Sequence, residues 1–215
     1  MVEKKRIPGR TVERLTQYRR VLEAEMTAKQ PGREMVFSHD IARCCGCTAA
    51  QVRRDLMVIG HQGSTNRGYD RRALIRAINE LMGRCGMQRL VLVGAGNLGT
   101  ALLSHFVDRA RMFATVAAFD TDPGKHDRLV SGVICHPLER LGEVVRREQV
   151  VVGVIAVPER AAQDVADLMI QAGIRGIVNF APVPIRVPAG VVLETIDISG
   201  TLEKVAFFVS SGTTA

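Results

Sequence analysis

A glycine-rich loop directly after an apolar strand constrains this chain more than any other feature. Residues 90–93 are Leu-Val-Leu-Val, and they run into Gly94-Ala-Gly96-Asn-Leu-Gly99, which has the spacing G-x-G-x-x-G. Between a strand and a helix, glycines at this spacing make a tight turn and let a pyrophosphate approach the helix N-terminus. The sequence therefore predicts a Rossmann nucleotide-binding domain, preceded by about ninety residues of other character.

The residues after this loop alternate between strand and helix patterns, as a doubly wound α/β domain requires. The second predicted strand ends in Asp120, about twenty positions after the glycines. A carboxylate there accepts from the ribose 2′-hydroxyl of NAD and repels the 2′-phosphate of NADP, so we expect a preference for NAD(H). The expected strands are 115–119, 133–135, 150–157 and 174–179, and the expected helices are 138–147 and 159–172.

Charge is divided unevenly along the chain. Residues 1–89 hold 18 Lys and Arg against 9 Asp and Glu, a net charge of +9, whereas residues 90–215 have a net charge of −2. A basic module joined to a near-neutral one indicates a polyanionic partner for the basic module. A solvated surface of basic helices would give the same composition.

The basic part has the pattern of short helices with a tight turn and a wing. Apolar residues at helical spacing predict helices near 12–26, 38–45, 48–59 and 70–82. Residues 63–69 have turn composition and carry Arg67, as the wing of a winged helix does. We therefore expect an N-terminal winged helix-turn-helix domain, with a generic helical domain as the alternative.

The third helix is the candidate recognition helix. Thr48 is expected to cap it, as Ser38 is expected to cap the preceding helix. Val52, Leu56 and Ile59 would form its buried stripe. Arginines on the other face of such a helix can bind guanine edges or phosphates in a major groove. The expected DNA-binding residues are Thr48, Ala50, Gln51, Arg53, Arg54 and Arg67.

Four motifs together resemble the Rex family of redox-sensing transcriptional repressors, over nearly the whole chain. They are Gln51-Val-Arg-Arg-Asp-Leu56, Gly94-Ala-Gly-Asn-Leu-Gly-Thr-Ala-Leu102, Phe119-Asp-Thr-Asp-Pro-Gly-Lys125 and Ala172-Gly-Ile-Arg-Gly-Ile-Val-Asn-Phe-Ala-Pro182. The resemblance implies a homodimer that binds an inverted-repeat operator when NADH is scarce. It also implies that NADH releases the DNA by rotating the two DNA-binding domains.

The resemblance implies three parts in the chain. They are a winged-helix DNA-binding domain at 1–84, a Rossmann NAD(H)-binding domain at 85–195, and a C-terminal helix and tail at 196–215. That helix is exchanged between subunits in the family, so Phe207 and Phe208 would be interface residues. The expected cofactor-binding residues are Gly94, Gly96, Asn97, Leu98, Gly99, Asp120, Lys125, Ala156, Val157, Pro158, Asn179 and Phe180.

Three residues are the candidate switch between the cofactor and the DNA. Arg20 and Asp197 match family positions whose side chains pair between subunits, whereas His105 stands where the family commonly has Tyr near the nicotinamide. Residues beside Asp197 also differ from the family pattern. We therefore expect a weaker response to NADH than is usual in the family, or a response to another signal. In the plainer interpretation, Asp197 caps a helix and His105 is a packed polar residue.

Three cysteines stand close together at the predicted turn before the recognition helix. Cys44, Cys45 and Cys47, with His39 nearby, could bind a metal or sense oxidants. The spacing is not that of a zinc knuckle, and free cysteines are often small buried hydrophobes, so no metal site is predicted.

Two other functions remain open from the sequence. The Rossmann domain could serve an NAD-dependent oxidoreductase, with His105 or His136 as its acid or base, but no separate substrate domain follows it, so we expect no enzyme and no catalytic residue. It could instead dimerise, or bind nucleotide without distinguishing NADH from NAD⁺, in a DNA-binding regulator. No apolar run approaches the ~20 residues of a membrane span, so we expect a cytoplasmic protein without a membrane partner.

Overall fold

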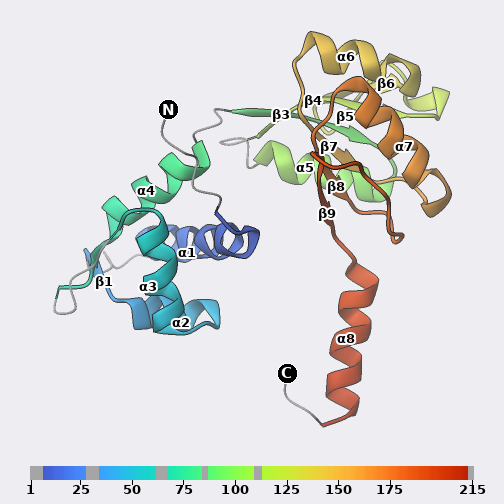
Figure 1. The fold of residues 1–215 in the computed structure, drawn as a ribbon. Coiled ribbons are helices and arrows are strands. Elements are labelled where there is room, and N and C mark those ends of the chain that lie inside the picture. The colour runs from blue at the N-terminus through green and yellow to red at the C-terminus, as the bar shows by residue number, and fades with distance from the viewer. Residues whose placement is uncertain (1–6, 28–33, 62–66, 84–86, 109–112, 213–215) are drawn as a thin grey trace. The chain divides into compact units, whose positions relative to one another are not determined.

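The computed structural model describes residues 7–27, 34–61, 67–83, 87–108 and 113–212. The chain divides into two compact units, Met1–Cys85 and Gly86–Ala215. Figure 1 shows the elements of both units.

The N-terminal unit is a small helical domain with a two-stranded wing. Helix α1 packs against α2, α3 and α4, and strand β1 pairs antiparallel with β2. Gly68 takes a positive φ of 73° beside β2, where a Cβ would lie 2.7 Å from the Val36 carbonyl oxygen. This arrangement is a winged helix-turn-helix, and most of the predicted wing, residues 62–66, lies outside the described residues. Its elements are α1 (Gly9–Thr27), β1 (Met35–Val36), α2 (Ser38–Cys45), α3 (Ala49–Val58), β2 (Tyr69–Asp70) and α4 (Arg71–Gly83).

The C-terminal unit is built on one seven-stranded sheet with the strand order β5-β6-β4-β3-β7-β8-β9. All neighbouring strands are parallel except the pair of β5 and β6. The chain leaves β3 toward β4 on one side and later returns to β7 on the other, which places the topological switch point between β3 and β7. The strands are β3 (Gln88–Val93), β4 (Phe113–Asp120), β5 (Arg128–Val130), β6 (Val133–Pro137), β7 (Val152–Ile155), β8 (Gly176–Asn179) and β9 (Val192–Thr195).

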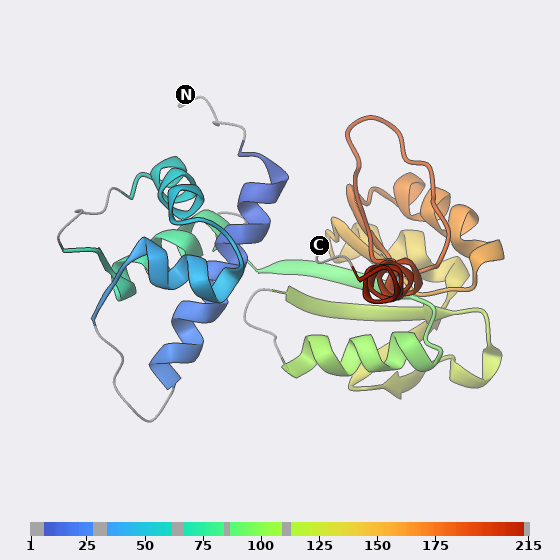
Figure 2. The ribbon, with the colours of Figure 1, turned by 90° about the horizontal axis from the view of Figure 1, so that it is seen from below.

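Helices cover the two faces of this sheet unequally. Figure 2 shows α5 on one side of the sheet and α6 and α7 on the other. The larger apolar cluster joins α6, α7 and the loop before β9 to the sheet, and the smaller one joins α5 to it. The helical elements are α5 (Asn97–Asp108), η1 (Pro123–Lys125), η2 (Leu138–Arg140), α6 (Leu141–Arg147), α7 (Glu159–Ala172) and α8 (Ile198–Ser210).

In the C-terminal unit, the strands β5 and β9 are absent from the sequence prediction. Strands β5 and β6 form a hairpin whose two turn residues, Ser131 and Gly132, have φ values of 49° and 81°, as a tight hairpin turn with two positive φ values requires. Strand β9 has only four residues and is mostly exposed, so its apolar residues are too few to separate a strand from a loop. The predicted helix 138–147 is also corrected, because its first residues form the 3-10 turn η2.

Helix α8 has no buried residue in its own chain. Ile198, Leu202, Val205 and Val209 follow one helical stripe, and each exposes more than half of its surface. Nothing in a single chain places this stripe against a partner, so the exchange of α8 between subunits stays a prediction. Among the described residues, no helix has the length and apolar character needed to span a bilayer.

Candidate functional site

The glycine loop lies at the switch point, and its three glycines have two different roles. A Cβ on Gly94, which has a φ of 101°, would collide with the Ala156 carbonyl, and a Cβ on Gly99 would collide with the Gly94 carbonyl. Both glycines are therefore required by the fold itself. A Cβ on Gly96 would meet nothing within 4 Å, so this glycine leaves open space beside the first turn of α5, where the backbone N–H groups lack intrahelical acceptors.

Asp120 ends β4 beside this loop and is held in place before any ligand binds. Its Oδ2 accepts from the Ala95 N–H and from Lys125 Nζ, both at 2.9 Å, and its Oδ1 accepts from the Asp122 N–H at 2.9 Å. Burial opposes ionisation, but these hydrogen bonds and the Lys125 charge outweigh it and lower the pKa of Asp120. A carboxylate has about four lone-pair sites, so one site on Oδ1 is left for a ligand hydroxyl.

A cleft of about 500 Å³ joins these groups, which is within the range of small-molecule sites. It brings together seven of the predicted cofactor residues: Gly94, Gly96, Asp120, Lys125, Ala156, Val157 and Pro158. The first half of α7 adds Arg160, Ala161 and Asp164, which sequence reasoning missed. The sequence shows the i, i+4 spacing of Arg160 and Asp164. It does not show which face of α7 meets the cleft, because that depends on how α7 packs on the sheet.

Asn179, a predicted cofactor residue, does not line the cleft. Its side chain is fully buried, donates to the carbonyls of Ala181 and Val183 at 3.3 and 2.9 Å, and accepts from the Ala181 N–H at 3.0 Å. It therefore shapes the loop after β8 and is not presented to the cleft. The other predicted cofactor residues that do not line the cleft are Asn97, Leu98, Gly99 and Phe180.

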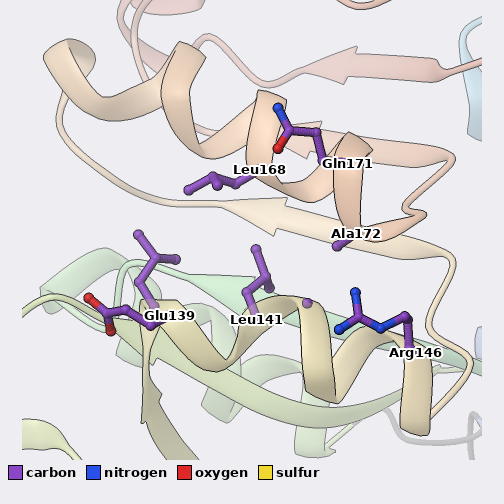
Figure 3. A pocket seen from close by; sticks show the side chains of 8 residues that line it. Glu139, Leu141, Arg146, Leu168, Gln171 and Ala172 are labelled. Carbon is purple, nitrogen blue, oxygen red and sulfur yellow. The ribbon is translucent and has the colours of Figure 1, made fainter.

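A second hollow of about 470 Å³ continues from the cleft between α6 and α7. Figure 3 shows Leu168 and Ala172 of α7 on one side of it and Leu141 and Arg146 of α6 on the other. Leu138 and Leu168 line both spaces. The hollow is lined by the polar side chains Glu139, Arg146 and Gln171 as well as by Leu138, Leu141, Leu168 and Ala172.

In the N-terminal unit, α3 has the surface that a recognition helix needs. The Thr48 Oγ1 accepts from the Gln51 N–H at 3.1 Å, which confirms the predicted cap. Arg53 and Arg54 are exposed, and so is Arg67 beside the wing. Ser38 does not cap α2, because Phe37 is the N-cap; the Ser38 hydroxyl instead accepts from Arg53 at 3.0 Å and orients that guanidinium.

Sequence reasoning missed Asp55, which lies on the buried side of α3 and is 2% exposed. It accepts two hydrogen bonds from Arg14 at 2.7 and 2.8 Å, one from the Tyr18 hydroxyl at 2.9 Å, and one from Gln51 Nε2 at 3.0 Å. Burial favours the neutral acid, but the bonds from Arg14, Tyr18 and Gln51 outweigh it and lower the pKa of Asp55. This cluster ties α3 to α1 and holds the amide of Gln51, a predicted DNA-contact residue.

The candidate switch residues are all exposed. Arg20 lies on α1, and His105 lies on α5 with its ring edge against Phe106 at a centroid distance of 6.2 Å. Asp197 is the N-cap of α8, where its Oδ1 accepts from the Gly200 N–H at 2.8 Å. Among the described residues, no group of three or more His, Cys, Asp or Glu is arranged to hold a metal ion.

Two protein-family models and several named repressors match this chain. A family described as a putative DNA-binding protein N-terminus matches residues 6–56, and one described as a CoA binding domain matches residues 86–183. A redox-sensing transcriptional repressor Rex from Desulforamulus reducens is 39% identical over 94% of this chain and 95% of its own length. The Rex repressor from Streptomyces coelicolor is 36% identical over 94% of this chain and 77% of its own length.

Solved structures of a Rex-family repressor each match 97% of this chain. The Rex-family repressor RSP in complex with β-NAD⁺ and operator DNA has a TM-score of 0.87 and 27% identity, and covers 97% of this chain and 95% of that one. RSP in complex with β-NADH has a TM-score of 0.84 and 26% identity, with 97% of each chain covered.

Proposed function

This chain belongs to the Rex family of redox-sensing transcriptional repressors, and we propose that it binds NAD(H) in the β3–α5 cleft and operator DNA through α3. NADH binding releases the operator. The nucleotide assignment rests on two residues that line the same cleft. The Cβ position of Gly96 has no protein atom within 4 Å, and the Asp120 carboxylate is held ionised beside Lys125.

The residues of the cleft fit a dinucleotide. The free N–H groups of the first turn of α5 suit the pyrophosphate, and the remaining lone-pair site on Asp120 Oδ1 suits a ribose hydroxyl. The ionised carboxylate also disfavours a 2′-phosphate, which makes NAD(H) the preferred ligand over NADP(H). The apolar side chains of Leu138 and Leu168, which line both the cleft and the hollow, suit the face of a flat base.

The DNA-binding surface is assigned to Thr48, Ala50, Gln51, Arg53, Arg54 and Arg67. Gln51 and Arg53 are held by Asp55 and Ser38 before DNA arrives. The net charge of +9 on residues 1–89 supplies the attraction to phosphates. A repressor of this kind acts on the chromosome, which places it in the cytoplasm.

The exposed stripe on α8 supports a homodimer. An apolar helical stripe that its own chain leaves in solvent is stabilised when another chain covers it. A two-fold dimer would also present two α3 helices to the two halves of an inverted repeat. Light scattering should give a dimer, and Leu202→Glu with Val205→Glu should give a monomer; a dimeric double variant would overturn this role of α8.

We assign the switch to Asp197 pairing with Arg20 of the partner subunit in one of two arrangements of the DNA-binding units. Asp197→Asn keeps an oxygen for the cap but removes the charge, whereas Asp197→Ala removes both. If the charge carries the switch, both variants lose the NADH effect on DNA affinity. If only the Ala variant loses it, the cap is the active feature and the ion pair is rejected.

The decisive experiment measures ligand and DNA binding on the same protein. Calorimetry with NADH, NAD⁺, NADPH and coenzyme A identifies the nucleotide, and coenzyme A is included because of the family matched at residues 86–183. A gel shift with the inverted-repeat duplex that the protein selects from random DNA, titrated with NADH and NAD⁺ separately, identifies the regulation. NADH that binds without weakening DNA binding would leave a regulator that does not distinguish the two redox states, and turnover of NADH with an added carbonyl substrate would favour an oxidoreductase.

A further inference from the structure

Three cysteines at the turn between α2 and α3 take no part in the contacts proposed above. Cys44 is exposed, whereas Cys45 and Cys47 are half-buried against the core of the N-terminal unit. Gly46 has a φ of 63°, and the Cys47 N–H donates to the Ala42 carbonyl at 3.2 Å. This turn folds Cys47 back toward the end of the helix that carries Cys44. Cys44 and Cys47 have the Cys-x-x-Cys spacing of redox-active dithiols.

The Cys47 thiol is also linked to the recognition helix through a phenol. Its Sγ lies 3.7 Å from the Tyr18 hydroxyl oxygen. That hydroxyl has one proton, and it donates this proton to the Asp55 carboxylate at 2.9 Å. An ionised carboxylate can only accept, so the thiol must be the donor and the phenol oxygen the acceptor in the Cys47–Tyr18 contact. The Cys47 thiol therefore begins a chain of hydrogen bonds that runs through Tyr18 to Asp55, within the cluster that ties α3 to α1.

We propose that Cys44 and Cys47 form a disulfide when the protein meets a peroxide, and that this bond weakens DNA binding by α3 independently of NADH. The exposed Cys44 thiolate attacks one peroxide oxygen, the O–O bond breaks, and Cys44 becomes a sulfenic acid. The Cys47 sulfur then attacks the sulfenic sulfur, the S–S bond forms, and the S–O bond breaks. Two thiols are oxidised, one hydrogen peroxide is reduced to two waters, and a dithiol reductant reverses the change.

The neighbouring Cys45 is the poorer partner for this reaction. Burial, followed by the charges of Cys47 and Cys44, raises the pKa of the Cys45 thiol and keeps it protonated. Oxidation of Cys47 removes the proton that Tyr18 accepts, because a disulfide sulfur has nothing to donate. Asp55 then keeps its own hydrogen bonds, but the Tyr18 hydroxyl no longer accepts a hydrogen bond from Cys47. The position of α3 relative to α1 therefore becomes less well fixed.

The test uses the full chain and two independent measurements. Reduced protein is treated with hydrogen peroxide, the remaining free thiols are alkylated, the disulfide is then reduced and labelled with a second reagent, and tandem mass spectrometry of the peptide that spans residues 44–53 identifies which cysteines were bonded. Operator affinity is measured on the duplex that the reduced protein selects from random DNA, before and after treatment and after dithiothreitol. Wild type should form the Cys44–Cys47 link and lose about fivefold in affinity, the effect of one weak hydrogen bond, and should recover on reduction. Cys45→Ser should behave as wild type, whereas Cys44→Ser and Cys47→Ser should not respond.

Any other result would overturn part of the inference. A link that includes Cys45, or no link at all, would refute the dithiol. A Cys44–Cys47 link without loss of affinity, or an equal loss in Cys44→Ser, would refute its effect on DNA. The DNA arm rests on the proposed function: if the reduced protein selects no duplex, the proposed function and the regulatory effect both fail, whereas the mass measurement still decides the thiol chemistry.

Discussion

Replacing Asp55 by alanine should destabilise the N-terminal unit far more than an ordinary surface change. Asp55 is 2% exposed and Arg14 is 25% exposed in the ion pair that joins them. Removing one partner of a buried pair costs about 3–5 kcal/mol, because the other charge is left uncompensated. Since a quarter of the Arg14 side chain reaches solvent, we expect the lower end, about 3 kcal/mol, which corresponds to roughly a hundredfold change in an opening equilibrium.

Hydrogen exchange of the full chain measures this change by position. In Asp55→Ala, the slowest amides of α1 and α3 should exchange roughly a hundredfold faster, whereas those of β3 and β7 should be unchanged. Glu13→Gln is the matched control, because it removes an exposed carboxylate from α1. Exchange in Asp55→Ala that matches Glu13→Gln would show that the ion pair contributes little and would refute the reasoning.

The same carboxylate predicts how the N-terminal unit responds to acid. The pKa of Asp55 is lowered on folding from its ordinary value of 3.8. A group with a depressed folded pKa contributes stability that is complete above the ordinary pKa and is lost as the pH falls below it. Protection of α3 should therefore fall below about pH 4 in wild type, and Asp55→Asn should lack this part of the decline.

Three further predictions concern ligand contacts. Gly96→Val should abolish NADH binding in calorimetry while leaving thermal stability nearly unchanged, because its Cβ position meets no protein atom within 4 Å; a stable variant with normal affinity would remove the pyrophosphate from this loop. Asp120→Ala should weaken NADH binding and narrow the preference for NADH over NADPH, and an unchanged preference would contradict the ribose contact. Replacing Arg53 and Arg54 together by Ala should abolish specific DNA binding and flatten the salt dependence by about one unit for each phosphate that is no longer bound; a normal gel shift would show that α3 is not the recognition helix.

Helices whose ends are marked by residues that start or stop a helix were predictable from the sequence. Helix α7 is expected at residues 159–172 and is found there, because Pro158 stands before it and Gly173 ends it with a φ of 110°. The turn into α3 was predictable for the same reason, since Thr48 is a good N-cap. Strands β5 and β9 had no such signals, because one belongs to a tight hairpin and the other is short and exposed.

The site was predictable only where the chemistry is local in sequence. The glycine loop and Asp120 belong to one strand–loop–helix–strand unit, so their meeting could be inferred from spacing. Asp55 was missed because its partner Arg14 lies 41 residues earlier, and no local pattern pairs them. A polar residue at a strand end can turn either to a ligand or to its own loop, and in this structure the Asn179 side chain bonds to its own loop at Ala181 and Val183.

The two proposed binding sites share a physical device. Asp55 and Asp120 are each kept ionised by a basic neighbour, Arg14 in one case and Lys125 in the other. Asp55 accepts from the amide of Gln51, a predicted DNA contact, whereas Asp120 itself lines the cleft and retains one lone-pair site on Oδ1. Because these groups are already fixed in the free protein, little side-chain freedom is lost when DNA or nucleotide binds. DNA affinity should therefore depend on Arg14 and Tyr18, which lie outside the predicted DNA-contact set and hold the Asp55 carboxylate in place.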